Sequence, residues 1–462
     1  FMIVIALPES VMPDVWSRII GTAIFILTAL TDMLDGMIAR KCNMITDFGK
    51  FIDPLADKFM IFGAMLVILY KYEYIRPVFL WVALIVIFRE LAVTSMRMIV
   101  ASNAHVVVAA AWKDLSSLDS VRRLFSYNKV TQDEQGKVEM YSFSNDRSNT
   151  FALLGDHLIV ASTTGVSIYS SSGSVVDSMS VKLTNPAIAV GGQTAAVYDI
   201  GGQTLLIYSA SGLVRDMSGE CSGNILSVSV NSSDYLALNA EKSGYKSAVT
   251  VYDASGEKTF AFNSSEHYVI DAVVMRDCKR MAAVTLGESD GTFADTVSIY
   301  SLGSDKADSV NTLTGSLLLS LDSVAGTLSC LTDESLTLFS SDGTLSGSYR
   351  YEYPYLRGSS MDGDNYAALL LSRYRSGSTT KLVTVSSDGT EMASLDSSQE
   401  VLSMSAAGKY IAVLYSDSLV LYTPQLQEYA RLDATEYARS VIMREDGTAV
   451  LIGSSSAWLY IP

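Results

Sequence analysis

The hydrophobic pattern of the chain changes character about a quarter of the way along it. Long apolar runs, each followed by a short charged stretch, recur at residues 19–30, 59–70, 77–88 and 92–112. After residue 138 the apolar residues occur in short β-branched and aromatic runs, separated by Ser, Gly and Asp. The first pattern is typical of helices and the second of strands. The sequence therefore predicts an α-helical part followed by an all-β part.

The helical part is predicted to be an all-α transmembrane bundle. The run VFLWVALIVIF is apolar on all sides, which favours contact with lipid over a one-sided soluble helix. Residues 16–39 and 49–70 reach the length of about 20 residues that spans a bilayer, provided that their polar ends face a protein interior. Arg76-Pro77 marks a turn between two helices. A buried helical bundle of a soluble protein is the alternative.

Strand ends in the second part recur with a mean period of about 42 residues, which is the period of a four-stranded propeller blade. Segments such as VSIYSSSG, LLIYSASG and LTLFSSDG align at one residue close to a strand end. The aligned residues are Tyr169, Tyr208, Tyr252, Tyr300, Phe339, Val385, Tyr422 and Tyr460. We predict a β-propeller of seven or eight blades, with its outermost strand shared between the two ends of the domain. The aligned aromatic side chains are expected to pack blades rather than to bind a ligand.

Charge follows the same division of the chain. The 462 residues carry 33 Lys and Arg against 49 Asp and Glu, a net charge of −16, although the mean hydropathy is +0.26. Residues 1–112 contain nine acidic and nine basic residues, so the net charge belongs to the remainder. An acidic balance argues against a nucleic-acid partner. The predicted parts are a membrane domain at 1–112, a linker with helical spacing at 113–137 and the propeller at 138–462.

Cysteines and histidines show no spacing that predicts a catalytic or zinc centre. They are scattered, at Cys42, Cys221, Cys278, Cys330, His105, His157 and His267. Two acid-glycine pairs in the second part, Asp342-Gly343 and Asp388-Gly389, could bind calcium, but ordinary hairpin turns are expected there.

The chemically distinctive pattern lies between residues 32 and 57. At about 100° per residue, one helical face about 140° wide carries the first set, which is Asp32, Asp35, Gly36, Ala39 and Arg40. Steps of four residues place the second set in one stripe of the next helix, which is Gly49, Asp53 and Asp57. The connection at 41–48 allows the two sets to face each other. A solvated acidic loop between two membrane helices is the alternative.

Four converging carboxylates near a membrane would repel one another, and intramembrane acids are rare and usually functional. Divalent metal ions would compensate that charge, and oxygen ligands suit Mg²⁺, Mn²⁺ or Ca²⁺ rather than zinc. A pair of such ions would hold a diphosphate for displacement at phosphorus. Gly36 and Gly49 leave room for a ligand beside the helix backbone, and Arg40 offers a charge-assisted contact to phosphate oxygens.

The pattern D-x2-D-G-x2-A-R-x8-G-x3-D-x3-D, together with the runs DFGKFIDPLADK and IFRELAVTSMR, resembles that of the CDP-alcohol phosphatidyltransferases. Within that family it looks most like the bacterial phosphatidylglycerophosphate synthases. The resemblance covers residues 1–112. It implies a membrane enzyme that transfers phosphatidyl from CDP-diacylglycerol to glycerol 3-phosphate and releases CMP. Because the pattern of the family's outer helices is cut short at Phe1 and after Trp112, a partial bundle is expected.

The resemblance also implies a role for each matching residue. Asp32, Asp35, Asp53 and Asp57 would form a two-metal site for Mg²⁺ or Mn²⁺, and Asp57 would also be the general base. The CDP-binding residues would be Gly36, Ala39, Arg40 and Gly49. Arg89 and Arg97 are the candidate cations for the acceptor phosphate, although arginines that snorkel to the membrane surface are an alternative.

Localisation follows from the same resemblance, which implies a multi-pass protein of a bacterial inner membrane. It would be surrounded by membrane lipids, with its active site facing the cytoplasm and with homodimers expected. The second part weakly resembles serine-rich bacterial propeller proteins without an assigned function, for which an unidentified protein or glycan ligand is the default hypothesis. Two alternatives stay open: a membrane-anchored binding propeller with a catalytically dead first part, and an artificial joining of two fragments.

Overall fold

The computed structural model describes residues 19–20, 23, 79–81, 83–86, 137–289, 291–304, 306–324 and 326–462. The chain divides into two compact units, Phe1–Ser117 and Leu118–Pro462. In the first unit the described residues are helical. Among the described residues, we find no helix with the length and apolar character needed to cross a membrane. The remainder of the predicted helical bundle and the linker at 113–136 lie outside the described residues.

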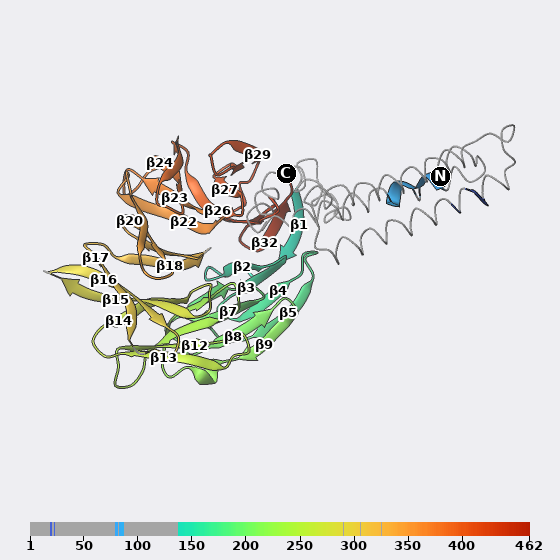
Figure 1. Cartoon of the computed structure of the whole chain (residues 1–462). Helices are drawn as coiled ribbons and strands as arrows, with labels where there is room; N and C mark the ends of the chain where they lie inside the picture. Colours follow the sequence, from blue (N-terminus) through green and yellow to red (C-terminus); the bar gives the residue numbers. More distant parts are fainter. Residues whose placement is uncertain are drawn as a thin grey trace, which may run out of the picture. The chain divides into compact units, whose positions relative to one another are not determined.

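The second unit is an eight-bladed β-propeller, which confirms the prediction from the repeat. In the described part of this unit, thirty-two strands form eight four-stranded antiparallel sheets (Figure 1). Seven blades use four consecutive strands, and the first strand of each lies innermost. In the eighth blade β1 (Lys137–Ser142) pairs with β32 (Ser456–Tyr460) at the outer edge. The two ends of the domain therefore close the ring together, as predicted.

The strands of the first four blades follow in chain order. Blade 1 contains β2 (Thr150–Leu154), β3 (His157–Ala161), β4 (Gly165–Tyr169) and β5 (Val175–Ser180). Blade 2 contains β6 (Pro186–Val190), β7 (Thr194–Asp199), β8 (Leu205–Ser209) and β9 (Gly212–Asp216), followed by the 3-10 helix η2 (Ser218–Glu220). Blade 3 contains β10 (Ile225–Val230), β11 (Leu236–Ala240), β12 (Ser247–Tyr252) and β13 (Lys258–Ser264). Blade 4 contains β14 (Tyr268–Val274), β15 (Arg280–Ser289), β16 (Thr292–Ser301) and β17 (Ala307–Thr314).

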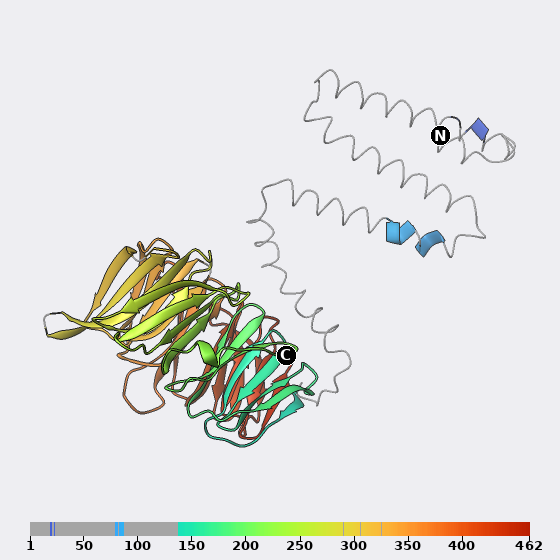
Figure 2. The ribbon, with the colours of Figure 1, turned by 90° about the horizontal axis from the view of Figure 1, so that it is seen from below.

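The other four blades complete the ring, which Figure 2 shows from below. Blade 5 contains β18 (Leu318–Val324), β19 (Thr327–Thr332), β20 (Ser335–Ser340) and β21 (Leu345–Arg350). Blade 6 contains β22 (Tyr355–Gly363), β23 (Tyr366–Ser372), β24 (Thr380–Ser386) and β25 (Glu391–Ser397). Blade 7 contains β26 (Val401–Ala407), β27 (Tyr410–Tyr415), β28 (Ser418–Tyr422) and β29 (Glu428–Asp433). Blade 8 contains β30 (Ser440–Met443), β31 (Ala449–Ile452), β32 and β1.

The repeat visible in the sequence is the end of the third strand of each blade and the turn that follows. In blade 1 the Ser170 N–H donates to Ser174 O at 2.8 Å, and the Gly173 N–H donates to Ser170 O at 2.9 Å. Gly173 has φ +82°, in the left-handed region that glycine adopts without strain. Just before this turn, the pairing of β4 with β5 shifts register between Ile168 and Tyr169. The Tyr-Ser-x-Ser-Gly pattern therefore encodes a hairpin with a bulge.

The hydrophobic core consists of eight clusters, one between each pair of neighbouring blades. Ile159 and Val197, for example, join blades 1 and 2, and Leu338 and Leu369 join blades 5 and 6. These side chains are at most 3 % exposed, and complete burial of such a side chain contributes about 1.5–3 kcal/mol. The aligned aromatic residues lie in these layers, and Tyr169, Tyr208 and Tyr460 are at most 6 % exposed. Their packing role is the one expected from the sequence.

Candidate functional site

The residues predicted to carry out phosphatidyl transfer lie outside the described residues. They are Asp32, Asp35, Gly36, Ala39, Arg40, Gly49, Asp53, Asp57, Arg89 and Arg97. Their metal-binding, nucleotide-binding and catalytic roles therefore stay predictions. In the propeller, two groups of residues carry chemistry that the strand repeat does not explain: carboxylates on inner strands, and hydroxyls between blades 5 and 6.

Three carboxylates stand on the innermost strands of consecutive blades. Asp271 lies on β14, Asp322 on β18 and Asp362 on β22. The Ala272 N–H donates to Asp271 Oδ1 at 2.9 Å, and Ser320 Oγ donates to Asp322 Oδ2 at 2.6 Å. Burial raises the pKa of Asp271 to about 6, and it also raises the pKa of Asp322. These groups hold protons more tightly than ordinary carboxyls do.

Asp362 also has its pKa raised to about 6, first by burial and then by the charge of Asp322. Its side chain is nevertheless exposed to solvent. Water that reaches the carboxylate reduces the rise in its pKa, because water hydrates the charged form and screens the repulsion from Asp322. Asp271 is half-buried and therefore gives the clearer stability effect.

Asp271→Asn is expected to stabilise the propeller at neutral pH and to have little effect at pH 4. The folded pKa of Asp271 lies above the ordinary value of 3.8, so its contribution to stability is complete below about pH 4 and is lost as the pH rises through about 6. A folded pKa of about 6 against the ordinary value of 3.8 corresponds to about 3 kcal/mol, which partial exposure reduces to about 1–2 kcal/mol. Thermal unfolding of the full chain at pH 4.0 and 7.5, followed by circular dichroism, measures the difference. An equal effect at both pH values, or the same response in exposed Asp433→Asn, would contradict this assignment.

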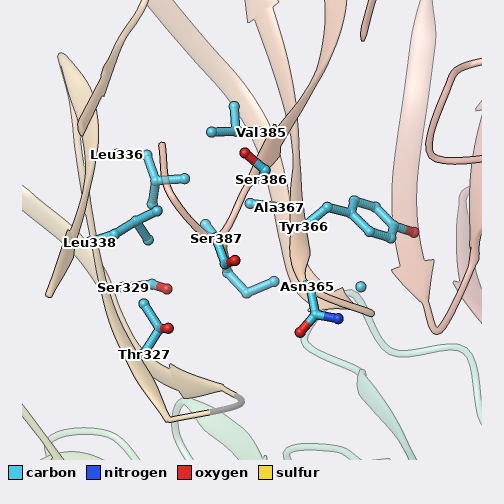
Figure 3. A pocket seen from close by; sticks show the side chains of 12 residues that line it. Thr327, Ser329, Leu336, Leu338, Asn365, Tyr366, Ala367, Val385, Ser386 and Ser387 are labelled. Carbon is cyan, nitrogen blue, oxygen red and sulfur yellow. The ribbon is translucent and has the colours of Figure 1, made fainter. Parts of the chain in front are cut away.

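A cavity of about 90 Å³ lies between blades 5 and 6 (Figure 3). Thr327 and Ser329 lie on the β19 side, and Ser387 and Asn365 lie on the side of blade 6. The complete lining is Thr327, Ser329, Leu336, Leu338, Met361, Gly363, Asn365, Tyr366, Ala367, Val385, Ser386 and Ser387. None of these residues is charged. The cavity therefore combines neutral polar groups with apolar walls, and it has room for several water molecules.

Ser329 stands out when the eight blades are compared. It pairs with Leu338, one residue before the aligned Phe339. The same register position in the other blades is apolar and buried, and the residues are Ile159, Ala196, Ala237, Ala282, Ala368, Ala412 and Val450. Ser329 is 8 % exposed and lines the cavity, and its Oγ is not one of the enclosed side-chain atoms that lack a hydrogen-bond partner in the described residues. A hydroxyl that opens onto a cavity can bond to water or to a ligand, which the packed alanines of the other blades cannot do.

Polar groups around the rim hold the cavity in shape. Ser386 Oγ donates to Asp388 Oδ1, and the Thr390 N–H donates to the same oxygen at 3.0 Å. These hydrogen bonds lower the pKa of Asp388 to about 2, so the carboxylate stays charged and accepts hydrogen bonds within the turn. The Tyr366 hydroxyl points away from the cavity and donates to Tyr410 O at 3.1 Å (Figure 3). The predicted hairpin at Asp388-Gly389 is therefore present, and its carboxylate is engaged by the turn.

A wider cavity of about 760 Å³ lies beside the long β15–β16 hairpin. Its lining includes His267, Glu288, Phe293, Leu317 and Asp333. Phe293 is 66 % exposed and Leu317 is 40 % exposed. Asp333 Oδ1 accepts from the Leu317 N–H at 2.8 Å, so one acid is engaged by the backbone. This cavity is open and weakly acidic, and no described contact indicates an occupant.

In the described part of the propeller, the cysteines and the potential metal ligands form neither a reactive thiol site nor a metal site. Cys221, Cys278 and Cys330 are free, and burial raises the pKa of Cys330 to about 12, which keeps it a neutral thiol. Within residues 137–289, 291–304, 306–324 and 326–462, no group of three or more His, Cys, Asp or Glu residues is arranged to hold a metal ion.

Comparison with known families divides the chain where its hydrophobic pattern changes. A model described as a family of unknown function, DUF5711, matches residues 127–456. The chain belongs to this family. Its DUF5711 region coincides with the propeller, and it contains both the inner-strand carboxylates and the cavity between blades 5 and 6.

A second family model, CDP-alcohol phosphatidyltransferase, matches residues 1–130 of this DUF5711 protein. This confirms the resemblance that the aspartate pattern carries. A CDP-diacylglycerol–glycerol-3-phosphate 3-phosphatidyltransferase of Bacillus subtilis is 42 % identical over 93 residues, which cover 20 % of this chain and 46 % of that protein. A Rickettsia bellii protein of the same name is 30 % identical over 125 residues, which cover 27 % and 65 %. The chain thus spans between about half and two thirds of these curated relatives.

Among solved structures, the DUF5711 propeller is similar to the C-terminal WD40 domain of Sif2. The TM-score is 0.52 at 13 % sequence identity, and the match covers 71 % of this chain and 98 % of that one. At this identity the likeness shows the propeller fold and nothing about a ligand.

Proposed function

We propose that the first part of this chain transfers a phosphatidyl group from CDP-diacylglycerol to glycerol 3-phosphate and releases CMP. The observation that carries the proposal is the complete aspartate pattern at 32–57 inside a region that matches the CDP-alcohol phosphatidyltransferase family. The names of the relatives from Bacillus subtilis and Rickettsia bellii support glycerol 3-phosphate as the acceptor.

Each motif residue has a proposed role in this reaction. Asp57 takes the proton from the acceptor hydroxyl, whose oxygen forms a bond to the β-phosphorus while the bond to the departing CMP oxygen breaks. Gly36, Ala39 and Gly49 leave space for the cytidine, and Arg40 binds the diphosphate. Arg89 and Arg97 bind the phosphate of the acceptor, because guanidinium groups suit phosphate oxygens.

Asp32, Asp35, Asp53 and Asp57 provide a set of hard oxygen donors that fits Mg²⁺ or Mn²⁺. Two such ions would neutralise the diphosphate and stabilise the charge that develops on its oxygens. The proposed location is a bacterial inner membrane with the aspartates on the cytoplasmic side. The exposed apolar side chains of Trp81 and Ile85 support a lipid environment for the first unit.

The test is CMP release by the full chain, reconstituted in lipid with CDP-diacylglycerol and Mg²⁺. We expect release with glycerol 3-phosphate to exceed release with serine by at least about 100-fold, because serine brings no phosphate to pair with the proposed acceptor-site cations. Release with inositol phosphate, which does carry a phosphate, should be lower because its ring differs in size and shape from glycerol. Chelation of the metal should abolish release. Equal release with every acceptor would contradict the acceptor, and no release with any acceptor would contradict the transferase.

A second candidate function is a membrane-anchored binding propeller whose first part has lost its activity. The extent of the DUF5711 match, residues 127–456, favours it, because most of the chain then belongs to the propeller. Undetectable CMP release together with saturable ligand binding by the full chain would support this alternative. Sequencing a peptide that spans residues 109–118 would show that both parts belong to one natural chain.

A further inference from the structure

We propose that the cavity between blades 5 and 6 binds a neutral polyhydroxyl group, supplied either by a free three-carbon polyol or by the terminal ring of a glycan. This binding site is independent of phosphatidyl transfer. Its central residue is Ser329, with Thr327 on the same strand and with Ser387 and Asn365 on the opposite side (Figure 3).

The hydroxyl of Ser329 has no counterpart at the same register position of the other blades. Five of the other seven blades have alanine at this register position, so a blade packs well without a hydroxyl there. Ser329 borders a cavity instead of a packed layer, and its hydroxyl is open to that space rather than enclosed. A ligand hydroxyl inside the cavity would replace water as the hydrogen-bond partner of Ser329.

The lining determines the chemistry of the ligand. Hydroxyl and amide groups exchange hydrogen bonds with alcohols in either direction, as donors or acceptors. No charged side chain lines the cavity, so a carboxylate or phosphate would lose its hydration without compensation. Apolar side chains, Leu338 and Met361 among them, line the cavity beside the hydroxyls, which suits the C–H face of a sugar or polyol. A volume of about 90 Å³ admits a glycerol-sized molecule or one edge of a sugar ring.

Methyl NMR of the full chain, labelled at Leu and Val and held in a sugar-free detergent, tests the proposal. The probes are glycerol, D-glucose and D-galactose, with D-glucuronate as the charged comparison. We expect saturable shifts of the Leu336, Leu338 and Val385 methyl signals with at least one neutral probe, and much weaker shifts with glucuronate. Binding by glycerol alone would support a free polyol, and tighter binding by a hexose would support a glycan. No shift with any neutral probe up to 50 mM would overturn the proposal.

Ser329→Ala separates a binding role from a structural one. It restores the residue common to other blades, so the thermal unfolding temperature should stay equal or rise, while polyol affinity falls by about fivefold with the lost hydrogen bond. Thr327→Val, which keeps the side-chain shape, should also weaken binding. The matched control is Ser394→Ala, on the exposed face of β25. Unchanged affinity in both Ser329→Ala and Thr327→Val would overturn the assignment of these hydroxyls.

Discussion

Asp57→Asn is expected to lower the rate of CMP release by at least about 10³-fold. The substitution keeps the size of the side chain but removes the base that accepts the proton of the acceptor hydroxyl, a contribution of about 10²–10⁴ in rate. It also replaces a carboxylate ligand by a weaker amide ligand in the proposed metal site. The measurement is initial CMP release with saturating glycerol 3-phosphate over a range of Mg²⁺ concentrations.

The control for Asp57→Asn is Asp14→Asn, an acid-to-amide change in the same unit but outside the aspartate pattern. It should retain the rate of the unmodified chain. Both variants should keep the helical circular-dichroism signal of the unmodified chain in lipid, which excludes misfolding of the first unit. Turnover that survives Asp57→Asn would contradict the role of Asp57 while leaving the transferase proposal in place.

The architecture of the propeller could be predicted from the sequence because its signal is local and repeated. In most blades the aligned residue is followed by turn residues. One glycine with positive φ is enough to define the hairpin there. That repeat alone is compatible with seven or eight blades. The closing pair β1–β32 decides the number, and that contact joins Lys137 to Tyr460 across the whole domain.

The cavity and the inner carboxylates could not be predicted in the same way. Ser329 lies in TLSCLT, a run that reads as an ordinary strand, and serine is frequent throughout this part of the chain. Aligning the second strands of the blades would have isolated it, because alanine is the usual residue there. Asp271 had a weaker signal, an acid inside the apolar run YVIDAVV. The role of each residue depends on which side chains of the neighbouring blade it contacts. The periodicity of the sequence does not specify those contacts.

At the interface that holds the cavity, the outer strand β21 of blade 5 lies against the backbone of a turn in blade 6. In blades 1, 2 and 4, Asp177, Arg215 and Ser309 stand on the outer strand and face the third-to-fourth-strand turn of the following blade. Blade 5 has Gly347 at this position. A Cβ on Gly347 would overlap Asp388 O, in the turn that contributes Ser386 and Ser387 to the cavity. Glycine is therefore required for this turn to close over blade 5.

Gly347→Ala should therefore destabilise the propeller by about 2–3 kcal/mol, because the new methyl group must displace backbone rather than a flexible side chain. For a domain of this size that corresponds to a fall of about 5 °C in the unfolding temperature, measured by circular dichroism on the full chain. The matched control is Gly219→Ala, at an exposed position where a Cβ meets nothing within 4 Å, and its effect should stay within about 0.5 kcal/mol. Because the displaced turn carries Ser387, Gly347→Ala should also weaken polyol binding, whereas Ser329→Ala weakens binding without loss of stability. An unfolding temperature equal to that of Gly219→Ala would show that the turn moves freely and does not close the cavity.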